Sequence, residues 1–422
     1  MMFKGKIRVG SDKSISQRAL ILSSIAEGKT YIKHLLNSRD IDCTMRALQM
    51  LGVSIGQKDE YVVVEGKGKF SLREPEDVLN LGNSGTGMRL LAGLVSGANF
   101  LTIFTGDESL RKRPMKRIVQ PLRMMGAMID GRENGAIPPL VIRGKCPLNG
   151  IRYEMPVASA QVKSAILLAG LFSQGEVEIK EPLPSRNHTE IMLKSMNVDV
   201  ECVDCLISLG SNRILHSPGY IEIGADISSA AYFMVTAALV PRSQVLFEDI
   251  VLNPTRAGIL DVFRMMNVEF EIRNSREING EKIGEVVVCY SPHIRGVSLE
   301  GSIIPRIIDE IPIICILASC ADGKTIIKDA SELRYKECDR IKAMVENLSH
   351  IGIKCEELPD GIIIEGGRLT GGKINTYYDH RIAMSFAIAS LVSKDNIVLD
   401  DTSSIDTSYP MFFKHLTDLT IS

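Results

Sequence analysis

The 422-residue sequence has no tryptophan, and only 5% of its residues are aromatic. Stacking platforms for nucleic-acid bases and aromatic clamps for sugars need such rings, so both are poorly supplied. The formal net charge is −2, from 49 basic and 51 acidic residues. A charge so close to zero gives no general attraction to nucleic acid or to an anionic membrane. Any anion binding must therefore come from local clusters of lysine and arginine.

Long apolar runs are also missing. The longest, around Ile313–Leu317, is far shorter than the roughly 20 residues that a membrane-spanning helix needs. The N-terminal segment MMFKGKIRVG has neither the apolar core of a secretory signal nor the Arg/Ser-rich character of a transit peptide. We expect a cytoplasmic protein.

The nine cysteines form no recognisable framework. Their odd number and wide spacing favour free thiols in a reducing compartment. One CxxC pair, Cys202 and Cys205, has no second pair and no nearby histidine to complete a zinc site. We interpret the segment as a strand and turn, and we expect no metal.

Common catalytic motifs are absent as well. The sequence contains no HExxH, no GxxxxGK[ST] and no GxGxxG, which removes the minimum signal for a zincin, a P-loop enzyme or a dinucleotide-binding fold. The glycine-rich stretch GNSGTG (82–87) is suited to cradle a phosphate or another ligand, but by itself it is a weak signal.

What the chain does contain is a repeat. A length of 422 residues predicts two or three domains. Six segments share a polar cap, a helix of small and apolar residues, a short break and a β-branched strand, and they begin about 70–80 residues apart. They start at Asp12, Asn83, Ser159, Asp226, Asp309 and Asp379.

A second, amphipathic helix follows in each unit, and it is shortened in the sixth, SYPMFFKHL. Six similar units predict an α/β protein of two domains, each with three helix–sheet units, in which the nearly all-apolar first helices are buried and the sheets lie outside. The midpoint, near 223–226, has no Pro/Ser-rich linker, which predicts a tight hinge. The alternative is a doubly wound sheet with coincidental spacing, since any α/β protein alternates helices and strands.

Cations concentrate where these helices are expected to begin. Helix N-termini already favour anions, so repeated cations there suggest an anionic ligand, such as a small molecule with phosphate or carboxylate groups. Individually these cations could instead be solvated or paired with Asp40, Asp107, Glu108 or Asp339. The cations at first helices are Lys13, Arg18, Arg89, Lys163 and Arg381, and those at second helices are Arg111, Lys112, Arg113, Arg186, Lys336 and Arg340.

Groups suited to proton transfer occur in the same segments. Asp309 and Glu310 precede an apolar helix, and Glu337 is next to Lys336. Neighbouring cations keep a carboxylate ionised, whereas desolvation raises its pKa toward neutrality, and the sequence leaves both open. His380, in the run Asp-His-Arg, fits a helix cap and a catalytic role equally well.

Taken together, the motifs resemble the EPSP (5-enolpyruvylshikimate-3-phosphate) synthase family along the whole chain. GSDKSISQRA (10–19), LGNSGTGMR (81–89) and TGDESLRKRPM (105–115) match its signature stretches, and SAQVKSAILLAGL, PSRNHTE, DEIPI, RYKECDRI and YDHRIAMSF follow in the family's order. The resemblance implies a two-domain inverted α/β barrel-like fold that closes over its substrates. It also implies that residues 1–10 join 225–422, leaving 11–224 as the other domain.

The resemblance further implies the reaction: transfer of the enolpyruvyl group of phosphoenolpyruvate to the 5-hydroxyl of shikimate 3-phosphate in the shikimate pathway, by a monomer without a cofactor. The implied catalytic residues are Asp309, Glu337 and Lys13. Those implied to contact shikimate 3-phosphate are Lys13, Ser14, Arg18, Ser159, Gln161, Ser185, Arg186, Asp309 and Lys336. Those implied to contact phosphoenolpyruvate are Lys13, Gly85, Arg113, Arg340 and Arg381, with Arg111 as a rival to Arg113.

Three positions depart from the family pattern. Asp12 is inserted where many relatives pass directly from serine to lysine, and Gly87 stands where alanine or threonine is common. Thr407 occupies the place of a lysine that some members carry near the C-terminus, so no catalytic lysine is assigned there. Lys414 lies nearby, but the match does not support it.

Three other functions compete with this interpretation. The sister enzyme that transfers enolpyruvyl to UDP-N-acetylglucosamine often carries a loop cysteine, and 105–115 has none. A non-catalytic anion-binding module would need the cations but not Asp309 and Glu337. RNA-modifying enzymes with a related unit are disfavoured by the near-neutral charge.

Overall fold

The computed structural model describes residues 2–421, which form two compact units. The N-terminal unit holds Ser11–Ile223 together with Ile278–Glu281. The C-terminal unit holds Gly224–Glu277, the chain from Lys282 onward and the N-terminal segment up to Gly10.

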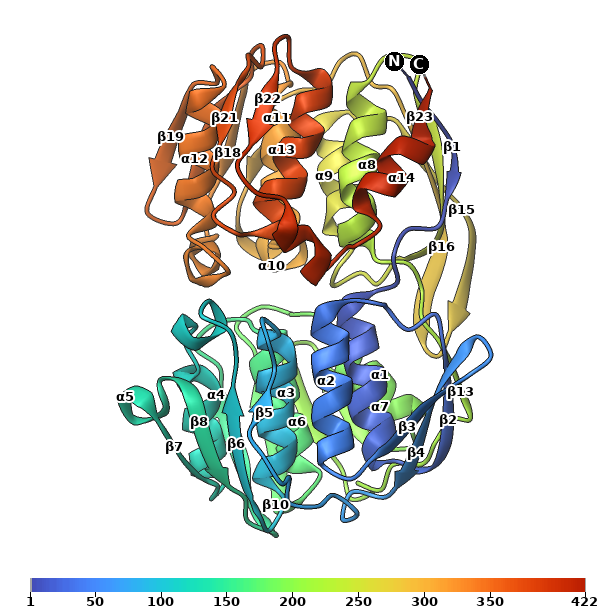
Figure 1. The fold of residues 1–422 in the computed structure, drawn as a ribbon, viewed down its shortest axis with the longest axis vertical. Helices are drawn as coiled ribbons and strands as arrows, with labels where there is room; N and C mark the ends of the chain where they lie inside the picture. Colours follow the sequence, from blue (N-terminus) through green and yellow to red (C-terminus); the bar gives the residue numbers. More distant parts are fainter. Residues whose placement is uncertain (1, 422) are drawn as a thin grey trace. The chain divides into compact units, whose positions relative to one another are not determined.

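Three buried helices form the centre of the N-terminal unit (Figure 1): α1 (Lys13–Ile25), α3 (Gly85–Ser96) and α6 (Ala160–Gly170). Their side chains are buried nearly all round, as the apolar sequences predict. The backbones of α3 and α6 approach closely at Gly93, where a Cβ atom would lie 2.3 Å from the carbonyl oxygen of Ala165. Only glycine allows this contact.

Each helix of this group is accompanied by a four-stranded sheet, and all three sheets share one pairing pattern. In order, they are β13-β2-β4-β3, β5-β6-β8-β7 and β9-β10-β12-β11, with the first pair parallel and the next two antiparallel. The strands are β2 (Glu27–Lys33), β3 (Ser54–Lys58), β4 (Tyr61–Lys67), β5 (Leu79–Asn80), β6 (Leu101–Thr105), β7 (Met128–Gly131), β8 (Ile137–Arg143), β9 (Leu148–Glu154), β10 (Ser173–Lys180), β11 (Val200–Val203), β12 (Leu206–Leu209) and β13 (Tyr220–Glu222).

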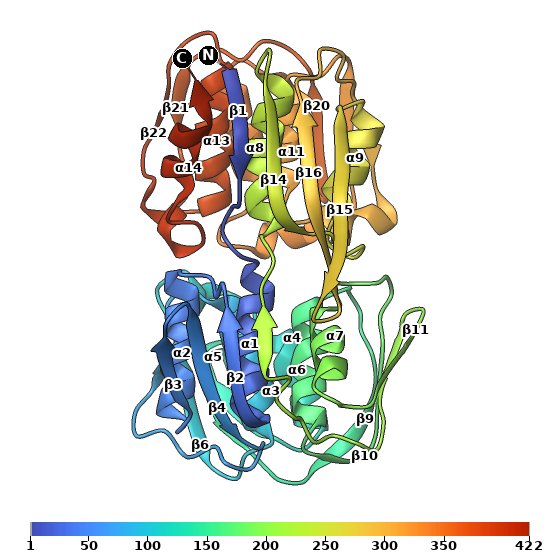
Figure 2. The ribbon, with the colours of Figure 1, turned by 90° about the vertical axis from the view of Figure 1, so that its right-hand side faces the viewer.

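The C-terminal unit repeats this plan around α8 (Ile227–Leu239), α11 (Ile311–Ser319) and α13 (His380–Val392), which pack against one another. One sheet runs β15-β16-β14-β1-β23 (Figure 2), a second β17-β18-β20-β19, and the third is reduced to β21-β22. Its strands are β1 (Met2–Ile7), β14 (Gln244–Val251), β15 (Phe270–Ile278), β16 (Glu281–Cys289), β17 (Ser298–Leu299), β18 (Lys324–Ile327), β19 (Cys355–Leu358), β20 (Gly361–Glu365), β21 (Gly372–Ile374), β22 (Ile397–Leu399) and β23 (Thr420–Ile421).

The predicted fold class is therefore confirmed: the helices are central, and the sheets are small and separate, each of mixed pairing except the parallel pair β21-β22. The doubly wound alternative is wrong, because it requires one continuous and mostly parallel sheet. The N-terminal strand β1 pairs in parallel with β14, within the C-terminal unit. The segment around Cys202 and Cys205 is the β11–β12 hairpin, as expected.

Second helices follow in all six units, but α4, α7 and α12 begin later than the cation pattern predicts. They are α2 (Arg39–Met50), α4 (Lys116–Met124), α7 (His188–Ser195), α9 (Gly258–Met266), α12 (Arg340–His350) and α14 (Phe412–Leu419). Short helices complete the chain: η1 (Leu110–Lys112), α5 (Arg132–Gly135), η2 (Gly301–Ile303), α10 (Ile304–Ile307), η3 (Ser331–Tyr335) and η4 (Ser403–Thr407). Across residues 2–421, no helix has the length and apolar character required to cross a membrane.

The expectation that Arg111, Lys112 and Arg113 start a helix is wrong. Pro114 disfavours helical backbone at the residue before it, so η1 ends and α4 begins only at Lys116. Arg186 and Lys336 also precede their helices, and of these second-helix cations only Arg340 lies in a first turn.

Candidate active site

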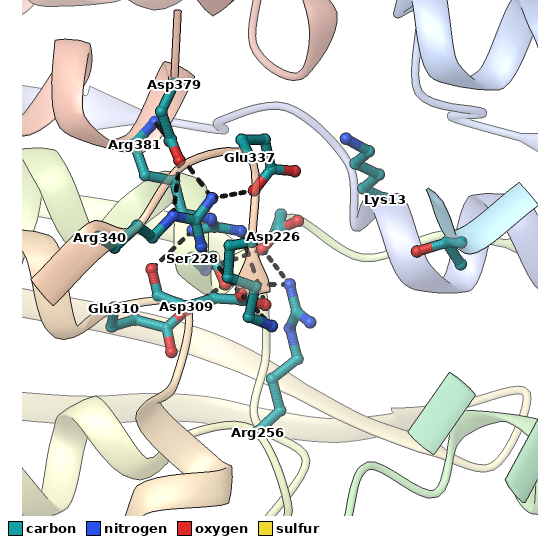
Figure 3. Close-up of polar contacts among 12 residues, drawn as sticks. Lys13, Asp226, Ser228, Arg256, Asp309, Glu310, Glu337, Arg340, Asp379 and Arg381 are labelled. Carbon is teal, nitrogen blue, oxygen red and sulfur yellow. Dashed lines mark hydrogen bonds and ion pairs between the residues drawn. The ribbon is translucent and has the colours of Figure 1, made fainter. Parts of the chain in front are cut away.

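Cations and carboxylates gather at the helix starts of the C-terminal unit. We call Asp309, Lys336, Glu337, Arg340, Asp379 and Arg381 the carboxylate–cation cluster, and Figure 3 labels all of these except Lys336.

Asp309 is the carboxylate that faces the most cations in this cluster. Its Oδ1 lies 3.7 Å from Lys336 Nζ and 3.7 Å from Arg340 Nη1, and its Oδ2 lies 3.7 Å from Arg381 Nη2. Arg381 Nη1 also donates to the Asp309 carbonyl oxygen over 2.9 Å. These charged contacts are longer than hydrogen bonds, and the Asp309 side chain keeps 15% exposure. A reacting group can therefore reach the carboxylate.

Arg340 is the fixed centre of the cluster. Its Nε donates to Asp379 Oδ2 over 2.8 Å and its Nη2 donates to Glu337 Oε2 over 2.6 Å. Burial disfavours the Asp379 charge, but the guanidinium of Arg340 outweighs it and holds the pKa of Asp379 below its ordinary value. Asp379 also caps α13 by accepting from the Arg381 N–H over 2.8 Å. Arg340, Glu337 and Arg381 are thereby fixed relative to one another.

Lys336 is less firmly held. Burial lowers the pKa of Lys336 below its ordinary value, although the nearby Asp309 carboxylate opposes the shift. The side chain remains 24% exposed. A half-buried ammonium whose ion pair with Asp309 is 3.7 Å long gains from an anionic ligand.

A buried polar network links the α8 and α11 starts in the same unit. Ser228 donates to the carboxylate of Glu310, the residue after Asp309, and Arg256 Nη2 donates to Asp226 Oδ1 over 2.7 Å and to Ser228 Oγ over 3.0 Å. All of these side chains are almost fully buried. The network fixes the turn that presents Asp309.

The N-terminal unit gathers its helix starts in the same way. Gln17 of α1 donates through Nε2 to Ser84 Oγ, the cap of α3, over 3.0 Å. Arg89 of α3 donates to Gln161 Oε1 of α6 over 2.5 Å, and Gln161 donates back to Thr86 Oγ1 over 2.9 Å. The positive ends of three helix dipoles therefore meet at one place, which favours an anion there.

Lys13 and Arg18 extend this group along α1. Lys13 forms an ion pair with Asp40, one of the predicted alternative partners. Arg18 is buried and donates to Thr189 Oγ1 over 2.6 Å and to Ser164 Oγ over 2.8 Å. The inserted Asp12 has a structural role: it caps α1 by accepting from the Ile15 N–H over 2.8 Å.

The glycine-rich stretch lies against two guanidinium groups. A Cβ atom on Gly85 would lie 3.0 Å from Arg113 Nη1 and 3.1 Å from Arg89 Nη1. Arg113 is buried and also donates to Asn83, whereas Arg111 is exposed. The structure thus brings Gly85 and Arg113 together and leaves the rival Arg111 outside this contact.

Ser159, Ser185 and Arg186 complete the predicted set. Ser159 is the N-cap residue of α6, and Ser185 and Arg186 lie in the loop before α7. Ser185 is held by the buried residues Lys163 and Glu181. The predicted residues therefore fall into two groups, one in each unit.

Sequence reasoning missed several polar residues that hold the predicted ones. Thr189 lies inside the motif PSRNHTE, which was a usable signal, but nothing in the sequence marked Ser164 as its partner. The missed residues are Ser164, Glu181, Thr189, Glu190, Ser228 and Arg256, whereas Asp226 was predicted as a helix cap but not as a partner of Arg256. His380 begins α13, and Thr407 ends η4, where its hydroxyl donates to the Ser404 carbonyl oxygen.

Among residues 2–421 no group of three or more His, Cys, Asp or Glu side chains is arranged to hold a metal.

Comparison with known proteins places this chain in a family. The sequence model of EPSP synthase (3-phosphoshikimate 1-carboxyvinyltransferase) matches residues 2–416. The 3-phosphoshikimate 1-carboxyvinyltransferase of Alkaliphilus metalliredigens is 47% identical over 414 residues, which cover 98% of this chain and 96% of that protein. The protein of the same name from Thermodesulfovibrio yellowstonii is 46% identical over 415 residues, with 98% and 96% coverage.

Solved structures agree with this family assignment. An EPSP synthase from Acinetobacter baumannii has a TM-score of 0.87 and 42% identity, and the match covers 100% of this chain and 96% of that one. The enolpyruvyl transferase NikO of Streptomyces tendae has a TM-score of 0.76 at 16% identity, covering 99% and 95%, and this likeness shows a shared fold only.

The fold and the matches define a transferase of the enolpyruvyl class. Within that class, the chain belongs to the EPSP synthase family. The family predicted from the motifs is thus confirmed, and so is the prediction of an enzyme of the 3-phosphoshikimate 1-carboxyvinyltransferase type.

Proposed function

We propose that this chain transfers the enolpyruvyl group of phosphoenolpyruvate to the 5-hydroxyl of shikimate 3-phosphate and releases phosphate, with the two groups of residues serving one reaction. The observation that carries the proposal is the carboxylate–cation cluster, which sets Asp309 and Glu337 among three cations at meeting helix starts. Both substrates carry a phosphate and a carboxylate, the groups that arginine and helix N-termini bind best.

Asp309 is assigned as the base for the attacking hydroxyl. The hydroxyl oxygen bonds to the central carbon of phosphoenolpyruvate as its proton passes to a carboxylate, and Asp309 is a partly exposed carboxylate that faces three cations at 3.7 Å. Lys336, beside it, is assigned to shikimate 3-phosphate. Arg340 and Arg381 are assigned to phosphoenolpyruvate.

Glu337 is assigned to proton exchange at the methylene carbon. That carbon gains a proton when the tetrahedral intermediate forms and loses one when the bond to phosphate breaks and the double bond returns. Glu337 keeps 17% exposure while Arg340 fixes one of its oxygens over 2.6 Å. One group with a fixed position can serve both steps.

The N-terminal group is assigned to anion binding. Lys13, Gly85 and Arg113 are assigned to phosphoenolpyruvate, and Lys13 also to shikimate 3-phosphate and to catalysis. The meeting helix starts of α1, α3 and α6 support this assignment. The remaining residues assigned to shikimate 3-phosphate are Ser14, Arg18, Ser159, Gln161, Ser185 and Arg186.

The proposal extends to the organisation of the protein. The two units are proposed as domains with a hinge at 223–226, where the chain passes from one unit to the other. A cytoplasmic location and a monomeric state complete the proposal, and gel filtration of the purified protein tests the latter.

Phosphate release from phosphoenolpyruvate tests the reaction. The purified protein is assayed without acceptor, with shikimate 3-phosphate, and with UDP-N-acetylglucosamine as the control acceptor. Release that requires shikimate 3-phosphate is the expected result. If phosphate is released only with the nucleotide sugar, the chain has the reaction of the sister enzyme. If a folded protein binds these anions but releases no phosphate with either acceptor, the proposal that it is an enzyme is wrong.

A further inference from the structure

One buried ion cluster of the N-terminal unit is not used by the proposed reaction. Lys163 Nζ lies 2.7 Å from Glu181 Oε2 and 2.7 Å from Glu190 Oε1, and the three side chains are at most 3% exposed. Burial disfavours the charge on Lys163, but Glu190 and Glu181 outweigh it, so that the pKa of Lys163 is raised. Removing one partner from such a cluster is costly, so its retention calls for a structural or functional reason.

The cluster contacts three groups of Ser185: the hydroxyl, the backbone N–H and the backbone carbonyl oxygen. The Ser185 hydroxyl donates to Glu181 Oε1, and the Ser185 N–H lies 3.4 Å from Glu181 Oε2. On the other side, Lys163 Nζ donates to the Ser185 carbonyl oxygen over 3.3 Å. Glu190 binds Lys163 but forms no hydrogen bond with Ser185, although it is buried equally deeply. The two glutamates are therefore alike in burial and in their contact with Lys163, but only Glu181 contacts Ser185.

We propose that Glu181 is a positioning residue for the binding of shikimate 3-phosphate. Together with Lys163, it holds Ser185 and the adjacent Arg186 in place. The inference rests on the proposed function, in which both residues contact that substrate. The loop between β10 and α7 contains no regular secondary structure, so its position depends on such side-chain bonds.

The hydroxyl bond adds to this order. A hydroxyl has one proton to donate, and in Ser185 it goes to Glu181. Together with the contacts of the N–H and the carbonyl oxygen, this bond fixes Ser185 before the substrate arrives, so that binding does not have to order the loop.

The test compares Glu181→Gln with Glu190→Gln. Both remove one carboxylate from Lys163 at the same depth, so both are expected to lower the unfolding temperature similarly. Only Glu181→Gln is expected to raise the KM for shikimate 3-phosphate, by on the order of tenfold, the effect of about one charge-assisted hydrogen bond. The KM for phosphoenolpyruvate is expected to change by less than about twofold. Equal KM changes in both variants, or an unchanged or lower KM in Glu181→Gln, overturn the proposal.

A double-mutant cycle with Ser185→Ala tests whether Glu181 acts through this serine. If it does, Glu181→Gln has a smaller effect on the KM in the Ser185→Ala background than in the unchanged protein. Additive effects overturn the proposal.

Thermal stabilisation by shikimate 3-phosphate alone separates this inference from the proposed function. If the unchanged protein binds the substrate but releases no phosphate, the proposed reaction is wrong. The inference can still be tested, because the stabilisation by shikimate 3-phosphate is then expected to be smaller in Glu181→Gln than in Glu190→Gln. If the unchanged protein does not bind shikimate 3-phosphate, both are wrong. Exposed Glu176→Gln, which loses only a surface pair with Arg152, is the control for charge removal.

Discussion

Arg340 donates to the fully buried carboxylate of Asp379 over 2.8 Å, and the same guanidinium binds Glu337 over 2.6 Å. One buried ion pair thus supports a carboxylate at which the proposed proton exchange takes place. Stability and catalysis are therefore coupled at Arg340 (Figure 3).

Asp379→Asn is expected to destabilise the protein by about 3–5 kcal/mol at neutral pH, because it leaves Arg340 buried with only part of its charge balanced. The folded-state pKa of Asp379 is lowered, so its contribution is present above the ordinary carboxyl pKa and is lost as the pH falls through the folded value. Urea unfolding of both proteins at several pH values measures this. A difference that grows toward acid pH contradicts the account.

Asp309→Asn and Glu337→Gln are expected to lower kcat by about 10²–10⁴-fold, the usual contribution of one general acid or base. Both substitutions keep the shape of the side chain, so the affinity for each substrate, measured by calorimetry, is expected to stay within a few-fold. Retained turnover in either variant refutes the role of that residue. Lost binding instead indicates that the carboxylate positions the substrates.

Gly85→Ala is expected to raise the KM for phosphoenolpyruvate by more than that for shikimate 3-phosphate. The new methyl group would lie 3.0 Å from Arg113 Nη1 and 3.1 Å from Arg89 Nη1, which displaces the guanidinium groups assigned around that substrate. Steady-state kinetics with each substrate varied in turn check this. Gly56→Ala is the matched control, because nothing lies within 4 Å of the new Cβ atom there. An unchanged KM for phosphoenolpyruvate removes Gly85 from the proposed contacts.

The lowered pKa of Lys336 predicts that kcat/KM for shikimate 3-phosphate depends on pH. Its pKa is lowered by burial, so in the free enzyme the ammonium loses its proton at a lower pH than an ordinary lysine does. Below that pKa the cation binds the substrate, and above it binding weakens, so kcat/KM for shikimate 3-phosphate should fall on the alkaline side. Lys336→Arg keeps its charge at all accessible pH values and should move this fall to higher pH. If kcat/KM for shikimate 3-phosphate falls at the same alkaline pH in both proteins, Lys336 does not bind this substrate as assigned.

The buried helices could be predicted from the sequence because each carries a polar cap and an apolar run long enough to fill the core. Asp12, Asp226 and Asp379 are observed caps of α1, α8 and α13. Helix starts near Arg111 and Lys336 were predicted too early, since local charge does not determine where backbone hydrogen bonding begins. Pro114 was the available signal.

The pairing of the supporting residues could not be predicted, because their partners are distant in sequence. Arg18 binds Thr189 and Ser164, and Arg256 binds Asp226, only once the helices pack. No periodicity or spacing marks such pairs. Motif resemblance identified residues expected to meet the substrates, whereas the structure shows what holds them.

The most direct test of the central claim is to identify the products. Phosphoenolpyruvate and shikimate 3-phosphate are incubated with the protein and followed by phosphorus NMR and mass spectrometry. The account predicts equal consumption of both, one inorganic phosphate per turnover, and a product in which the enolpyruvyl group is joined to shikimate 3-phosphate through its 5-hydroxyl. Unchanged shikimate 3-phosphate, with or without phosphate release, would contradict it.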